Sequence, residues 1–166
     1  MTEGLVQRDW VPLPGSLPPV AESGTLYLLP TRMPAGGALV TAPMYLAENR
    51  FFPKEARAEG IRAQFSLDRD SRKFLSEFSA DASTWALALA LIGPITDWVV
   101  LGIELFIRGR GRELGYEDED AKSQKLKVSI AELDQGSSFV RGLEIEGRGA
   151  DVLEALRTII PSDQDS

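Results

Sequence analysis

The feature of the sequence that most constrains the fold is an apolar stretch over residues 83–107. It contains WALALALI at residues 85–92, is interrupted by Gly93-Pro94, and resumes as WVVLGIELFI at residues 98–107. Transfer of so many large apolar side chains out of water is favourable. The stretch therefore has to lie in a protein core, in an interface between molecules or in a membrane.

Three interpretations of segment 85–107 compete. Leucine and alanine form helices well, and a helix would gather Ala86, Asp97 and Glu104 near one small-or-polar stripe. This pattern favours a buried central helix or a tight helical pair. A membrane-inserting segment is the second interpretation, against which each acidic residue costs on the order of 3 kcal/mol near the bilayer centre. Two buried strands are the third.

Two residue types that carry much of protein chemistry are absent from the sequence. The 166 residues include no cysteine and no histidine, which excludes disulfides, Ser-His-Asp and Cys-His nucleophiles, and nearly every transition-metal site. We therefore expect no cofactor and no metal. The start of the chain lacks the basic and apolar pattern of an export signal, so a cytoplasmic protein is expected.

Composition predicts three parts along the chain. Residues 1–23 contain four of the ten prolines and are expected to form a proline-rich arm, because proline removes a backbone donor and favours extended geometry. Residues 24–160 are expected to form a single α+β domain. Residues 161–166 form an acidic tail.

Local patterns predict several elements within this domain. A short apolar run at residues 25–29 and an alternating one at 61–67 indicate strands. Proline at the start and glycine at the end indicate a helix at 53–60. Alternation around a polar loop predicts a hairpin at 125–146, and helical spacing predicts a helix at 150–160.

Two further segments are less regular. Asp70 is a candidate cap for a helix in which Phe74, Leu75 and Phe78 share one face, and residues 109–124 are expected to form a solvated polar connector. Together the patterns predict an α+β fold. Its mixed or antiparallel sheet packs on a long apolar helical segment and on a C-terminal helix.

One region of this acidic chain is basic. The net charge of the whole chain is −7, yet between Arg50 and Lys73 seven cations stand against four acids. An acidic protein with a local basic face favours an acidic protein partner over nucleic acid or an anionic membrane. The aromatic residues Phe65 and Phe74 fall on expected core faces, which further disfavours base stacking. The candidate partner-binding residues are Arg50, Phe51, Phe52, Lys54, Arg57 and Arg62.

Two carboxylates lie in an apolar context and suggest acid–base chemistry. Asp97 and Glu104 are seven residues apart, which is ~10.5 Å along a helix. This exceeds the ~6.5–9.5 Å between the carboxylates of inverting glycosidases. Glu104 also has Arg108 four residues later as a candidate ion-pair partner.

Four elements follow one another between residues 80 and 160. They are an apolar segment at 87–107 broken at Gly93, arginines within 108–112, a hairpin at 125–146 and a final helix. In this order the C-terminal half resembles a small bacterial module called the effector-associated constant component. The resemblance implies a non-catalytic companion protein in a bacterial conflict or signalling system. It covers about half of the chain and carries over no functional residue.

The sequence therefore predicts a non-enzymatic protein-interaction or adaptor module, whose partner is another protein. The first alternative is a membrane-associating protein that uses segment 85–107. The second is an enzyme that depends on carboxylates. A second copy of the chain is a further candidate partner.

Overall fold

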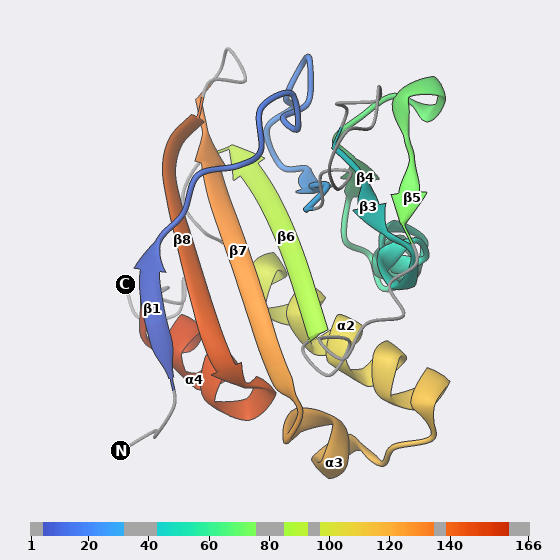
Figure 1. The fold of residues 1–166 in the computed structure, drawn as a ribbon, viewed down its shortest axis with the longest axis vertical. Coiled ribbons are helices and arrows are strands. Elements are labelled where there is room, and N and C mark those ends of the chain that lie inside the picture. Colours follow the sequence, from blue (N-terminus) through green and yellow to red (C-terminus); the bar gives the residue numbers. More distant parts are fainter. Residues whose placement is uncertain (1–4, 32–42, 76–84, 93–96, 135–138, 160–166) are drawn as a thin grey trace, which may run out of the picture.

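A six-stranded mixed sheet forms the centre of the molecule. The computed structural model describes residues 5–31, 43–75, 85–92, 97–134 and 139–159 (Figure 1). The strand order is β1-β8-β7-β6-β2-β4. The strands are β1 (Val6–Asp9), β2 (Leu26–Leu28), β4 (Ala63–Phe65), β6 (Trp85–Ile92), β7 (Lys125–Leu133) and β8 (Phe139–Arg148).

Beside the central sheet, the described residues form a second, two-stranded sheet and four α-helices. The short strands β3 (Tyr45–Leu46) and β5 (Phe74–Leu75) pair in parallel. Two 3-10 turns lie at Ala47–Asn49 and Arg69–Ser71. The helices are α1 (Phe52–Ala58), α2 (Asp97–Leu114), α3 (Asp118–Lys122) and α4 (Gly149–Ile159).

Strand β6 lies in the middle of the sheet and is buried on both faces. It pairs in parallel with β7 over its whole length and antiparallel with β2. Side chains alternate along a strand, so its tryptophan and leucines point to one face and its alanines to the other. Parallel strands joined by α2 and α3 form a crossover, the arrangement in which both sheet faces are covered.

The two faces of β6 belong to two different clusters of buried residues. The leucine face packs against α1, α2 and α4, with Val99, Ile103 and Leu156 among its partners. The alanine face packs against Trp10 and Leu17 of the N-terminal segment. Figure 1 shows α2 and α4 on the far side of the sheet, while the N-terminal segment crosses its near side. Because large and small side chains alternate in WALALALI, the helices pack on the face with the large side chains and the N-terminal arm packs on the face with the alanines.

Most of the elements expected from local patterns are present. The α+β class, with a mixed sheet, is confirmed. Strand β2 lies within the apolar run 25–29, and β4 lies within the alternating run 61–67. The antiparallel pair β7–β8 and helix α4 confirm the hairpin and the terminal helix.

The structure corrects the prediction of a helix over residues 85–92. These residues form strand β6, and the described helical structure of segment 85–107 begins only at Asp97. Leucine and alanine favour a helix locally, but pairing on both sides within a sheet overrides that preference. The long apolar helical segment is thus α2 alone, and segment 85–107 is one strand followed by one helix.

Two smaller predictions are wrong in their secondary structure, although residues 112–120 are exposed as expected for the connector. Residues 109–114 continue α2, and α3 lies within the expected polar connector. Asp70 lies in a 3-10 turn, and Phe74 and Leu75 form strand β5, while Phe78 is outside the described residues. In both places the chain uses contacts with distant segments that short windows of sequence do not show.

The expected proline-rich arm contains one strand. Val6–Asp9 form β1, which pairs antiparallel with β8 at one edge of the sheet. The prolines follow that strand, and Pro12 and Pro18 are buried. Among the described helices, none is both long and apolar enough to cross a membrane.

Two glycines of α2 give a matched test of this packing. A Cβ at Gly111 would lie 2.7 Å from Cβ of Ala121 on α3, whereas one at Gly102 would meet Leu26 and Phe52 at 3.4 Å, an ordinary contact. Gly111→Ala should lower the free energy of unfolding by about 1–2 kcal/mol, because α3 must move away. Gly102→Ala should be neutral or stabilise by up to about 1 kcal/mol through helix propensity. Urea unfolding measures both, and equal effects of the two substitutions would contradict the α2–α3 contact.

Candidate protein-interaction site

An open hollow of about 510 Å³ lies at β4, the last strand of the sheet order. Among the described residues, its lining contains three arginines and no carboxylate, although the chain as a whole carries a net charge of −7. We call it the β4 hollow. It is lined by Arg57, Gly60, Ile61, Arg62, Ala63, Gln64, Phe65 and Arg72.

The three arginines of the β4 hollow come from three places in the chain. Arg57 lies in the last turn of α1, and its Nη1 donates a hydrogen bond of 3.2 Å to the carbonyl oxygen of Ala63. Arg62 lies just before β4, and its exposed guanidinium is 3.6 Å from Glu22. Such an exposed ion pair contributes little to stability and leaves Arg62 free to exchange partners.

Arg72 is held more firmly than the other two. Its guanidinium lies 4.3 Å from the ring centroid of Phe65, and its Nε donates a hydrogen bond of 2.9 Å to the carbonyl oxygen of Leu67. A cation over an aromatic face is attracted by the ring quadrupole. Arg72 is therefore fixed in direction while half-buried at the rim of the hollow.

An aromatic cluster supports the strand behind the hollow. The rings of Tyr45, Phe65 and Phe74 have centroids 5.2 to 5.9 Å apart, the range in which aromatic pairs stabilise each other. The cluster joins β3 and β5 of the small sheet to β4. It therefore fixes the far end of β4, where Arg72 packs.

The hydroxyl of Tyr45 is buried in this cluster. It lies 3.0 Å from Ser66 Oγ and accepts a hydrogen bond of 3.0 Å from the backbone N–H of Leu67. Burial raises the pKa of Tyr45 above its usual range, because the phenolate would lose its hydration. The neutral hydroxyl is thus part of the support for the segment after β4.

The structure separates the six residues that the sequence proposed for partner binding. Arg57 and Arg62 line the β4 hollow. Arg50 and Phe51 lie beside each other, with the guanidinium 5.7 Å from the ring centroid, and Phe51 is 53% exposed. Lys54 is exposed on α1 and does not line the hollow.

Phe52 has a different place from the other five. It is 4% exposed and packs edge-on against Phe106 of α2, with centroids 6.4 Å apart. It is a core residue of α1, so a partner would not reach it. Adjacent helical residues point in different directions, which explains why Phe51 is outside and Phe52 inside.

Of the charged and aromatic residues that line the hollow, sequence reasoning missed two, Arg72 and Phe65. Arg72 belongs to the basic region, but its approach to β4 depends on how the chain returns through the small sheet. Phe65 was expected on a core face; it does pack against the core, but it is only partly buried and also lines the hollow. The signal available in the sequence was that Arg72 follows, by a few residues, a predicted strand that contains the aromatic residue Phe65.

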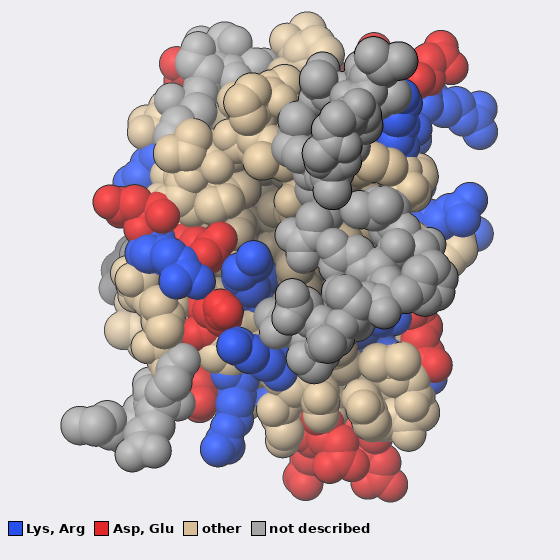
Figure 2. All heavy atoms as spheres, in the orientation of Figure 1, with Lys and Arg blue, Asp and Glu red and all other residues tan. Residues whose placement is uncertain are grey.

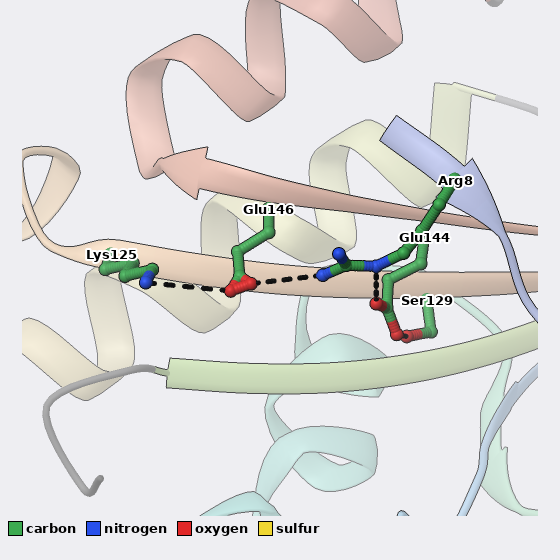
Figure 3. A network of polar contacts seen from close by, with 5 residues as sticks. All are labelled: Arg8, Lys125, Ser129, Glu144 and Glu146. Carbon is green, nitrogen blue, oxygen red and sulfur yellow. Dashed lines mark hydrogen bonds and ion pairs between the residues drawn. The ribbon is translucent and has the colours of Figure 1, made fainter. Parts of the chain in front are cut away.

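A second polar feature lies at the opposite side of the sheet (Figure 3). Arg8 of β1 donates from Nε to Glu144 at 2.5 Å and from Nη2 to Glu146 at 3.2 Å, bridging two residues on one face of β8. Lys125 lies 3.7 Å from Glu146, and the hydroxyl of Ser129 donates to Glu144 at 3.2 Å. The hydrogen bond and charge of Glu144 raise the pKa of Arg8 above its usual range.

This network fastens the edge strand β1 to β8. A serine hydroxyl beside a carboxylate can form a nucleophile–base pair. Here, however, Glu144 is also bound to Arg8, and Ser129 is 4% exposed, so a substrate would not reach the hydroxyl. We therefore assign the network a role in holding β1 in place.

The carboxylates considered for catalysis do not form a described pair. Glu104 forms an ion pair with Arg157 of α4 rather than with Arg108. The side chain of Asp97 lies outside what the structure describes. Across the described side chains, no group of three or more Asp or Glu residues is arranged to hold a metal ion.

The surface charges are unevenly distributed in the view of Figure 2. Acidic side chains gather over α3, whose first turn contains Asp118, Glu119 and Asp120. Basic side chains, with acidic ones beside them, project from the side of the molecule where β4 and β5 lie. The charges of Arg8, Glu144 and Glu146 alternate in sign on the sheet face.

Comparison with known proteins gives no relative from which a function could be transferred. No protein family, no curated protein and no solved structure matches the chain.

The Tyr45 hydroxyl gives a pH-dependent test of the support behind the hollow. Tyr45→Phe should lower the free energy of unfolding by about 1–2 kcal/mol near neutral pH, because the N–H of Leu67 loses its acceptor. The folded-state pKa of Tyr45 is raised, so its stabilising effect is present below pH ~10 and is lost as the pH rises above that value.

The difference in unfolding free energy between wild type and Tyr45→Phe should therefore narrow from about pH 8 to about pH 11. Chemical unfolding at both pH values measures it. Tyr116→Phe, at an exposed ring, is the matched control. A constant or widening difference for Tyr45→Phe would contradict a buried neutral hydroxyl.

Proposed function

We propose that the chain is a non-enzymatic interaction module that binds an acidic segment of another protein in the β4 hollow. The observation that carries the proposal is the lining of this hollow, whose described residues include three arginines from three places in the chain and no carboxylate. Arginine presents several donors in a planar fork that matches carboxylate geometry. A carboxylate-rich segment is therefore the complementary ligand.

Two features of the hollow favour a protein over nucleic acid. Single strands bind by stacking bases on free aromatic faces, but Arg72 already lies over Phe65. The phosphate backbone also needs an extended basic track, whereas the net charge of the whole chain is −7. An acidic peptide needs only a short cationic site, and the β4 hollow provides one.

The burial of the apolar segment supports a protein partner over a membrane. The described side chains of β6 from Trp85 to Leu91 are at most 5% exposed. Membrane association through segment 85–107 would require this strand to leave the middle of the sheet. Because opening the core in this way costs free energy, the exposed arginines are the better candidates for contact with a partner.

The resemblance of the C-terminal half to the effector-associated constant component extends the proposal. Such modules are non-catalytic companions, so the partner would belong to a bacterial conflict or signalling system. The absence of cysteine from the chain agrees with a reducing compartment such as the cytoplasm. These two points define where a native partner should be sought.

A defined peptide tests the proposal directly. An alternating Thr-Glu octapeptide should bind the intact protein and shift the NMR amide signals of residues 57–65, with affinity that falls as salt is added. Arg57→Glu together with Arg62→Glu should weaken binding about tenfold or more, because two attractions become repulsions.

The matched control is the pair Arg108→Glu and Arg112→Glu. These exposed arginines of α2 give the same change of charge away from the hollow. Equal weakening by both double variants, or tighter binding of an oligo-dT strand than of the peptide, would overturn the proposed function. An alternating Thr-Lys octapeptide should not bind.

A further inference from the structure

Among the strands that the structure describes, β4 is the last of the sheet, and its outer edge faces the hollow. On the inner side, Leu26 donates to the carbonyl oxygen of Arg62, and Ser66 donates to that of Leu28. Residues of a paired strand alternate between the two sides. The N–H and C=O groups of Ala63 and Phe65 therefore point away from β2. The hydrogen bond from Arg57 to the Ala63 oxygen agrees with this direction.

The shape of the hollow follows this outer edge. All three residues of β4, Ala63 to Phe65, line it, although alternate side chains of a strand point to opposite faces of the sheet. A hollow on one face alone would involve only every second residue. The β4 hollow therefore runs along the edge of the strand, beside its backbone.

We propose that the acidic segment binds as an extended strand that pairs with the outer edge of β4 and adds a seventh strand to the sheet. This inference rests on the proposed function and specifies how the partner is recognised. Backbone pairing with an exposed sheet edge is a recurrent mode of peptide binding, in which alternate side chains give specificity. The pairing groups are the N–H of Ala63 and both backbone groups of Phe65.

The arginines fit an added strand on both of its faces. Arg72 lies over the Phe65 ring, on the face of the sheet that carries α1 and α2, and Arg57 comes from α1 on the same face. Arg62 precedes the buried Ala63 and so points to the opposite face. Carboxylates at alternate positions of the added strand would meet Arg57 and Arg72 together.

The opposite edge of the sheet, at β1, differs because its arginine is already paired within the protein. Strand β1 carries Arg8, which is already bound to Glu144 and Glu146. Short, charged edge strands also serve to prevent unwanted pairing. The test therefore has to distinguish two cases. In the first, the edge of β4 binds carboxylates through its arginines but does not pair with another strand. In the second, the backbone of β4 also pairs with the bound segment.

Backbone-modified peptides make this separation without changing the protein. Two Thr-Glu octapeptides are compared, one N-methylated at every threonine and the other at every glutamate. In a strand, only alternate N–H groups face the neighbouring strand. One methylated peptide should lose about tenfold or more in affinity, and the other should bind like the unmodified peptide.

Amide exchange in the protein gives the second measurement. Saturation with the unmodified peptide should slow exchange of the Phe65 amide about tenfold or more, because it becomes a ladder donor. The Gln64 amide faces β2 and should not change. Unequal affinities together with protection of Phe65 support strand addition.

The failures of the two proposals are distinguishable. If both methylated peptides bind equally well and Phe65 exchange is unchanged while binding still depends on Arg57 and Arg62, strand addition is overturned and the charge-based function stands. If the unmodified peptide does not bind, both are overturned.

Discussion

The fold depends on a single strand whose two faces differ in side-chain size rather than in polarity. The leucines of β6 give α2 and α4 a deep apolar surface, while its alanines leave room for the N-terminal segment to lie close to the sheet. A strand buried on both faces needs neighbours on both sides, and β7 and β2 provide them. The order of the remaining strands follows from this position.

That order also determines where the candidate site lies. Because β2 occupies the far side of β6 and pairs with β4 in parallel, β4 becomes the end of the sheet. Helix α1 and the small sheet flank this end and bring Arg57 and Arg72 to it. Under the proposed function, the local concentration of arginine in an acidic chain would make the open edge selective, since charge complementarity governs which partners approach.

Much of this fold is predictable from the sequence, and the exceptions have physical causes. The alternation around Ala63 and the helical signals at Pro53 and Gly60 are local, so strand β4 and helix α1 could be predicted. The strand formed by the Leu-Ala run could not be predicted, because both residues favour helices. When both faces of a strand are apolar, its period of two does not show as an alternation of apolar and polar residues. Arg57 and Arg62 follow from local charge, whereas Arg72 joins the site only through tertiary contacts.

The most direct measurement of the central claim is hydrogen exchange of the β6 amides in the isolated protein. If β6 is the buried middle strand, the amides of Leu87 to Leu91 should be among the slowest to exchange and open only with global unfolding. Their protection should be the same with and without detergent micelles. Rapid exchange of these amides, or protection that requires micelles, would contradict a core formed by the chain itself.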